Sequence, residues 1–104
     1  MKNKKWKIGG IYTYLNECYI PLEYENDYVF SYNVSYNTKS ISREQIVEIL
    51  KEQVVSQSRF FCGKIFAYEQ LFDGYLGQID EKILDKLLNG LYNSTTYQIN
   101  KKLR

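Results

Sequence analysis

The sequence predicts an α+β domain, in which an antiparallel sheet of three or four strands carries two or three helices on one face. Residues 6–37 are rich in β-branched and aromatic side chains, and polar turn residues interrupt them, as in a three-stranded meander. Two amphipathic helical patterns follow, and the tail returns to β character. Strands that precede helices, instead of alternating with them, are typical of antiparallel sheets covered on one side.

The third strand of the meander has the clearest pattern, because apolar and mostly small polar residues alternate from Tyr28 to Asn37. We expect the face that packs against the first helix to carry Tyr28, Phe30, Tyr32, Val34 and Tyr36. The opposite face then carries Val29, Ser31 and Asn33.

The pairing of the strands follows from parity, since a slip of one residue turns every side chain to the other face. A two-residue turn at Asn16-Glu17 and a three-residue loop over residues 25–27 give one continuous apolar face. A two-residue turn at Asn26-Asp27 would oppose apolar to polar side chains, so we reject it. Gly9-Gly10 is expected to form a bulge or bend before the first strand.

The first helix is predicted to begin at Arg43, because Ser42 and Gln45 can form a capping box. Its apolar residues continue to Phe61, and Gly63 is a natural stop. A second helix is expected from near Asp80 to Gly90. The residues that it turns inward are Ile83, Leu84, Leu87, Leu88 and Leu91.

Two segments are less clear. Residues 64–73 fit either a helix or a strand, and we favour a short helix that ends at Asp73-Gly74. The tail from Thr95 to Leu103 returns to β character, so the sequence allows a fourth strand there and leaves a three-stranded sheet as the alternative.

The length of 104 residues corresponds to one domain, 1–104, with basic frayed ends at about 1–5 and 101–104. Half of the fourteen basic residues lie near the two ends, whereas all twelve acidic residues lie between Ile8 and Asn100. The body is therefore acidic and the tails are basic. The basic set at the ends comprises Lys2, Lys4, Lys5, Lys7, Lys101, Lys102 and Arg104.

The composition indicates the kind of organism that encodes the chain and the compartment in which we expect it. Eleven tyrosines stand against one proline and a single alanine, Ala67. Tyr and Lys have A+T-rich codons, so this usage points to a low-G+C bacterium or to one of its phages or plasmids. Coding bias accounts for much of the tyrosine excess on this interpretation, and a binding surface is the alternative. Cys18 and Cys62 lack ligand spacing, and no stretch is long and apolar enough to cross a bilayer or to form a signal peptide. We expect a soluble protein that lies in the bacterial cytoplasm or, if a phage encodes it, in the cytoplasm of the host cell.

Catalysis is not expected. The chain has no histidine, which removes the commonest general base and metal ligand. Glu44, Glu48 and Glu52 share a helix face, but such carboxylates are usually solvated, and Cys62 lacks a base partner. We predict no enzyme activity, no cofactor and no metal.

A protein partner is the favoured hypothesis for function. By parity, several aromatic side chains stand on the sheet face opposite the core, and acidic residues of the second strand share that face and would repel phosphate. The predicted binding residues are Trp6, Tyr12, Tyr14, Tyr19, Glu23 and Glu25. The function hypothesis extends to an inhibitor, encoded by a phage or mobile element, of a host nucleic-acid-handling or defence protein with a basic surface, by analogy with anti-CRISPR proteins. A homodimer is compatible with the sequence.

The alternative is a nucleic-acid-binding accessory or regulatory protein that uses its basic tails and exposed aromatic rings. A steep dependence of binding on salt would favour this alternative.

Overall fold

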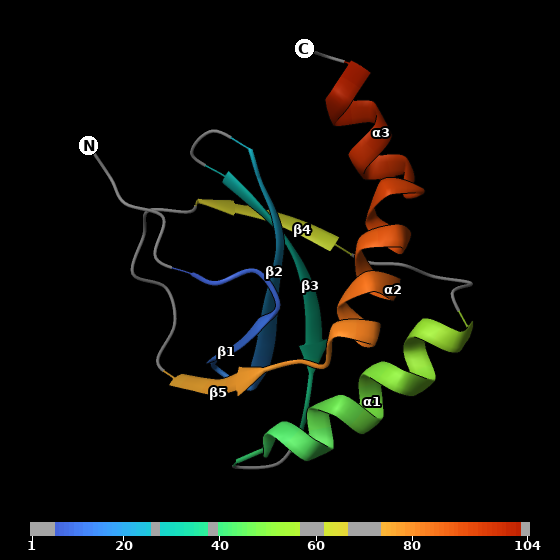
Figure 1. Ribbon diagram of the computed structural model, residues 1–104. Helices are drawn as coiled ribbons and strands as arrows, with labels where there is room; N and C mark the ends of the chain where they lie inside the picture. Colours follow the sequence, from blue (N-terminus) through green and yellow to red (C-terminus); the bar gives the residue numbers. More distant parts are fainter. Residues whose placement is uncertain (1–5, 26–27, 38–39, 57–61, 67–73, 103–104) are drawn as a thin grey trace.

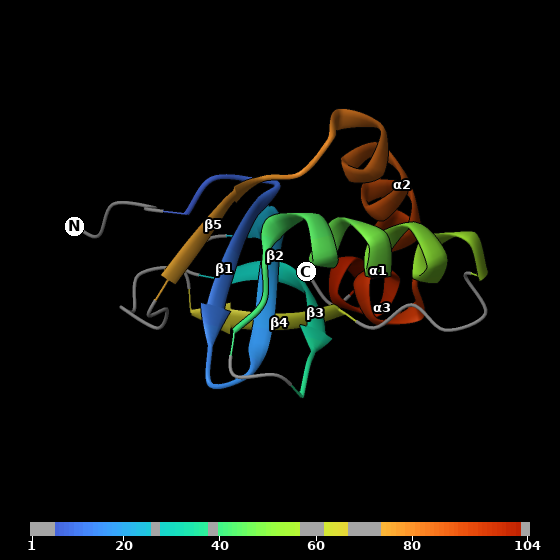
Figure 2. The same ribbon diagram turned by 90° about the horizontal axis from the view of Figure 1, so that it is seen from below.

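The computed structural model describes residues 6–25, 28–37, 40–56, 62–66 and 74–102. Five strands form one antiparallel sheet in the order β4-β3-β2-β1-β5. In sequence order the elements are β1 (Gly10–Tyr14), β2 (Glu17–Glu25), β3 (Tyr28–Ser35), α1 (Arg43–Ser56), β4 (Cys62–Phe66), β5 (Gly74–Gln78), α2 (Glu81–Tyr92) and α3 (Thr95–Lys102). The helices gather on one side of the sheet (Figures 1 and 2). The α+β class is thereby confirmed, and no described helix has the length and apolar character needed to cross a membrane.

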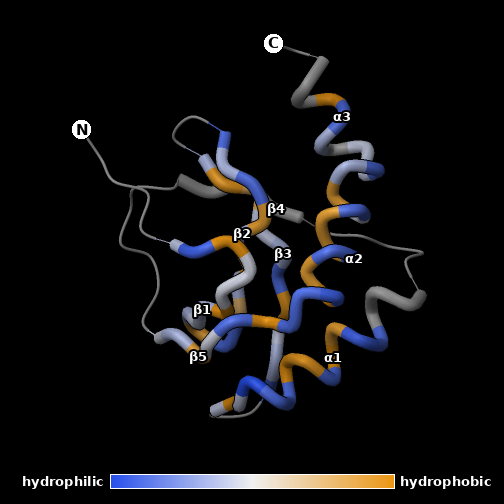
Figure 3. Tube along the Cα trace, in the orientation of Figure 1, coloured by the Kyte–Doolittle hydropathy of each residue, from blue (hydrophilic) through white to orange (hydrophobic). Residues whose placement is uncertain are grey.

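The core lies between the sheet and the helices, where apolar residues of α1 and α2 recur at helical spacing (Figure 3). Phe30, Tyr32 and Val34 are buried there as expected, and Tyr36 packs partly against the same cluster. From the helices, the buried members of this core are Ile46, Val47, Leu50, Ile83, Leu87 and Leu91. Leu84 and Leu88 of α2 are only partly buried.

The turn between β1 and β2 lies one residue earlier than the sequence suggested. Tyr14 pairs with Glu17, so Leu15 and Asn16 form the turn, with φ angles of 48° and 64°. The resulting register differs from the expected one by two residues. A shift of two leaves every side chain on the same face, so Cys18 is still buried in the core.

A β-bulge at Leu22 changes the pairing of β2 with β3. Cys18 pairs with Val34 and Ile20 with Tyr32, as expected, but beyond the bulge Glu23 pairs with Phe30. Glu25 then pairs with Tyr28, so two residues separate these strands, and the expected three-residue loop is wrong. The bulge follows the buried Pro21, which has no amide hydrogen to give to the sheet.

The predicted bend at Gly9-Gly10 is present. Gly9 has a φ of 83°, its N–H donates to the carbonyl of Pro21, and its own carbonyl accepts from Ile79. A residue with a side chain would be strained in this conformation. The bend brings the segment before β1 onto the sheet, next to the end of β5.

The start of α1 is confirmed. The N–H of Ser42 donates to Oε1 of Gln45 (2.8 Å), and the N–H of Gln45 donates to Oγ of Ser42 (3.2 Å), which is the expected capping box. The helix ends at Ser56 and does not continue to Phe61, which lies outside the described residues. Gly63 belongs to β4, so it is no helix stop.

Three expectations for the second half of the chain are wrong. The favoured helix over 64–73 conflicts with β4 at residues 64–66, and residues 67–73 lie outside the description. The tail is helix α3, because Ser94 begins it and the N–H of Tyr97 donates to the Ser94 hydroxyl. Residues 95–102 therefore add no strand, and β4 and β5 form the edges of the sheet. Likewise, α2 passes through Gly90 and ends at Tyr92.

Candidate functional site

Tyrosines from three neighbouring strands line up on the sheet face that points away from the helices. Tyr12 of β1 pairs with Tyr75 of β5 on one side and with Tyr19 of β2 on the other. Paired residues point to the same face, and alternation adds Tyr14 of β1 to it. We call Tyr12, Tyr14, Tyr19 and Tyr75 the tyrosine surface.

Two of these rings are open to solvent. Tyr75 is 49% exposed and Tyr14 is 38% exposed, whereas Tyr12 and Tyr19 are half-buried. The surface therefore combines rings that a partner could cover with rings that already pack against the sheet.

Tyr12 and Tyr75 hold each other in place. Their ring centroids are 4.9 Å apart, and the Tyr12 hydroxyl accepts a hydrogen bond from the N–H of Lys7 (2.9 Å). Gly10 makes room for the pair, since an added Cβ would lie 2.9 Å from Cε2 of Tyr12 and 3.1 Å from Cε1 of Tyr75. The pair is thus fixed before any partner binds.

Glu17 gives this surface a negative charge. Its Oε2 accepts a hydrogen bond from the hydroxyl of Ser35 on β3 (3.3 Å). Burial raises the pKa of Tyr19, and the hydrogen bond with Glu17 raises it further. The phenol of Tyr19 therefore stays protonated and can donate to the carboxylate.

Trp6 lies in a small cluster on the same side of the sheet but is itself only 7% exposed. It is buried with Val29, and Tyr12 and Tyr24 pack against them. The Tyr24 hydroxyl accepts from the Trp6 N–H (3.1 Å) and donates to the Trp6 carbonyl. Trp6 is therefore close to Tyr12, as expected, but it supports the surface from within and offers little area to a partner. The three-residue loop expected over 25–27 would have placed Tyr24 opposite Tyr28 on the core face, but beyond the bulge Tyr24 pairs with Val29 and lies here.

Glu23 and Glu25 do not lie on this face, contrary to the sequence expectation. The bulge at Leu22 turns Glu23 toward the helices, where its Oε2 accepts from the hydroxyl of Tyr97 (2.7 Å). Glu25 follows two residues later on the same face and is buried. The single extra residue in β2 thus removes both carboxylates from the predicted site.

Comparison with protein-family models, with curated proteins and with solved structures gave no match.

The site must therefore be assessed from its own geometry, and Tyr75 is the member that sequence reasoning missed. It lies in β5, whose sequence Gly-Tyr-Leu-Gly-Gln contains two glycines and no β-branched residue. The strand forms through its pairing with β1, so its own sequence carries little signal.

Only some of the basic residues that the nucleic-acid alternative relies on lie in the described part of the chain. Lys7 is exposed, and Lys101 and Lys102 end α3. Lys2, Lys4, Lys5 and Arg104 lie outside the described residues.

Among the described residues, the other side chains that could react or bind a metal do not lie together in one site. Burial raises the pKa of the Cys18 thiol to about 12, which leaves it unreactive at neutral pH. Glu44, Glu48 and Glu52 point to solvent from α1. Within the described ranges, no three metal-ligating side chains cluster.

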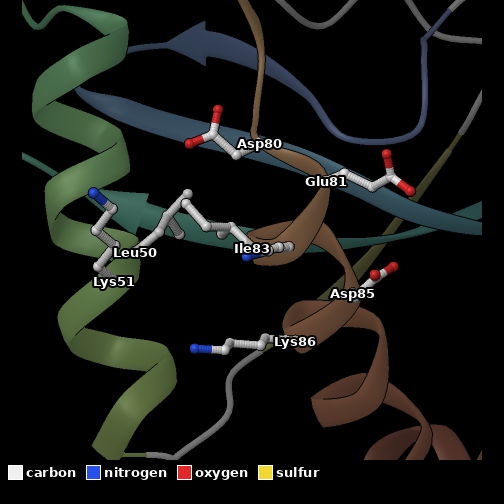
Figure 4. A pocket seen from close by; sticks show the side chains of 8 residues that line it. Leu50, Lys51, Asp80, Glu81, Ile83, Asp85 and Lys86 are labelled. Carbon is white, nitrogen blue, oxygen red and sulfur yellow. The ribbon is translucent and has the colours of Figure 1, made fainter.

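A groove of about 740 Å³ lies between α1 and α2 (Figure 4). Leu50 and Ile83 form its base, and Lys86 extends from α2 toward α1. Lysines and carboxylates both line its rim, so it selects no ligand by charge.

Proposed function

We propose that this chain is a small non-enzymatic binding protein that docks a protein partner on the tyrosine surface. The exposed rings of Tyr14 and Tyr75, which lie beside the packed rings of Tyr12 and Tyr19, are the observation that supports it most. The opposite face of the sheet is taken up by the core, so a partner that binds the sheet would meet this face.

The chemistry of tyrosine favours a protein partner. A phenol ring offers a large apolar area together with a hydroxyl, and it loses little conformational freedom when covered. The contacts of Tyr12 with Tyr75 and with Lys7 lower that cost further, because these rings are already ordered. Tyrosine is accordingly enriched among the residues that carry most of the affinity at interfaces.

The charge of the surface favours a basic partner. Glu17 lies next to Tyr19, and the exposed carboxylates of α1 add negative charge elsewhere on the body. Such charges would steer the protein toward a positive surface. The finer proposal is therefore a cytoplasmic inhibitor that covers a basic surface of a host nucleic-acid-handling or defence protein, and its phage or mobile-element origin rests on the composition alone.

The same rings could stack on the bases of a single strand, which is the alternative function. Glu17 weighs against it, because a carboxylate beside the rings repels the phosphates that would accompany the bases.

Affinity capture from the lysate of a low-G+C bacterium, with and without nuclease treatment, tests the proposal. The wild-type chain is compared with a Tyr14→Ala/Tyr75→Ala variant. Both side chains are largely outside the core, so this variant is expected to fold. We expect a protein that survives nuclease treatment and is captured by the wild type but not by the variant.

Tyr92→Phe serves as the matched control, because Tyr92 is also an exposed tyrosine but lies on α2. It should capture the same partner as the wild type. Capture that disappears on nuclease treatment would favour the nucleic-acid alternative, and equal capture by the double variant would show that another surface binds.

A further inference from the structure

Leu15, at the tip of the β1–β2 turn, is an apolar side chain that the fold does not use. It is 73% exposed, and its φ of 48° lies in the left-handed region, which Asn and Gly occupy far more readily than Leu. Asn16, the second residue of the turn, fits its φ of 64° well. Neither burial nor backbone conformation therefore explains a leucine at this position.

An apolar hollow lies directly beside this leucine. It has a volume of about 390 Å³, and Tyr36, Ile41 and Leu76 contribute apolar surface to it. The remaining residues around it are Thr13, Leu15, Asn16 and Ser40. Figure 2 shows the β1–β2 turn beside the segment that leads into α1. A projecting apolar side chain and a hollow that could receive one thus share one patch.

We propose that this patch pairs with the same patch on a second copy of the chain. In a twofold dimer the same surface is used by both subunits, so a projection next to a hollow is self-complementary. Leu15 of each copy would enter the hollow formed by Tyr36, Ile41 and Leu76 of the other.

The charge of the patch supports a second copy as the occupant. Among the residues that the structure describes, none that lines the hollow is charged. Two identical patches can therefore meet without repulsion between like charges, whereas a charged partner would find no complementary group there.

The patch is separate from the tyrosine surface. Thr13 and Leu76 alternate along their strands with Tyr12, Tyr14 and Tyr75, so they point to the opposite face of the sheet. Dimerisation would leave the tyrosine surface open and would present two copies of it to a partner. Such a bivalent arrangement raises avidity when both sites can engage.

The dimer is expected to be weak. Seven described residues line the hollow, against the roughly 20 to 30 residues per partner of a standard stable interface, so we expect a dissociation constant on the order of 10 µM to 100 µM.

Sedimentation equilibrium of the full chain, from about 1 µM to about 1 mM, tests the proposal across that range. We expect the wild type to pass from monomer to dimer. Leu15→Asn removes the projection and suits the backbone of the turn, so it should weaken dimerisation at least about tenfold while the melting temperature of the dilute monomer stays equal or rises.

Two further variants support the assignment. Ser40→Glu places a charge at the exposed rim and should also weaken the dimer, most strongly at low salt. Ile99→Asn, at a half-exposed position on α3, should leave it unchanged.

A wild-type chain that stays monomeric throughout would overturn the proposal. So would a Leu15→Asn variant that dimerises like the wild type, or a dimer that is lost in Tyr14→Ala/Tyr75→Ala instead. Loss of partner capture in that tyrosine variant with an intact dimer would leave this inference standing, so the two proposals fail independently.

Discussion

Glu23 on β2 accepts a hydrogen bond at 2.7 Å from the hydroxyl of Tyr97 on α3, which joins residues 74 positions apart in the chain. Tyr97 also packs edge-on against Phe30 and in a tilted arrangement against the ring of Tyr92, with centroid distances of 5.2 Å in both cases. A hydrogen bond from Tyr92 to Glu23, together with burial, raises the pKa of Tyr92 to about 12. The bulge in β2 therefore turns Glu23 toward the helices, where its carboxylate links α2 and α3 to the sheet.

This arrangement predicts a loss of stability at alkaline pH. The pKa of Tyr92 rises from 10.0 to about 12, so the protonated phenol is favoured in the folded state. The stability that this gives is complete below about pH 10 and disappears as the pH rises toward 12. Urea unfolding at about pH 8 and about pH 11 should show a smaller alkaline loss for Tyr92→Phe than for the wild type. An equal loss in the two proteins would contradict the role of Tyr92.

The position of Phe30 in the core predicts that replacing it lowers the free energy of unfolding strongly. This side chain is fully buried between the sheet and Tyr97, so Phe30→Ala should cost about 3 to 5 kcal/mol, a large part of the ~5 to 15 kcal/mol available to a domain. Chemical denaturation measures the change. The exposed control Ile99→Ala should stay within about 0.5 kcal/mol of the wild type. A cost below about 1 kcal/mol for Phe30→Ala would mean that the core is misplaced.

The Cys18 thiol should not react with thiol-specific reagents while the protein is folded. Its thiol is buried, and burial raises its pKa to about 12, so almost none of the reactive thiolate exists at neutral pH. In a Cys62→Ser variant, a thiol-specific reagent should react only at the rate of unfolding. Reaction as fast as that of a small thiol would show that Cys18 is accessible.

Nucleic-acid binding should be weak. If all seven basic residues near the ends contacted duplex phosphates, the logarithm of affinity would fall with the logarithm of salt at a slope of about −6. We expect a slope of about −2 or shallower with micromolar or weaker affinity, because the acidic body opposes binding. Salt titrations on a labelled duplex and a labelled single strand check this. Nanomolar, sequence-dependent binding at physiological salt would favour the nucleic-acid function.

Features of the fold that depend on local sequence could be predicted. The capping box of Ser42 and Gln45 involves residues three apart, and the alternation of β3 lies within one strand, so both were readable from the chain.

Features that depend on distant contacts could not. The tail alternates at Tyr97 and Ile99 like a strand, yet it is a helix, because Ser94 begins it and Tyr97 meets Glu23 and Phe30. The bulge at Leu22 likewise depends on the pairing of β2 with β3. Pro21 was a local signal for it, because proline within a strand is typical of bulges and edge strands. The sequence therefore placed Tyr12, Tyr14 and Tyr19 on the correct face of the sheet and Glu23 and Glu25 on the wrong one.

The central claim is that the tyrosine surface binds a protein, and calorimetric titration of the captured, purified partner tests it most directly. The account predicts that Tyr14→Ala/Tyr75→Ala weakens binding at least about tenfold, or about 1.4 kcal/mol, while Tyr92→Phe binds like the wild type. A double variant that keeps its melting temperature and binds the partner with unchanged affinity would contradict the account.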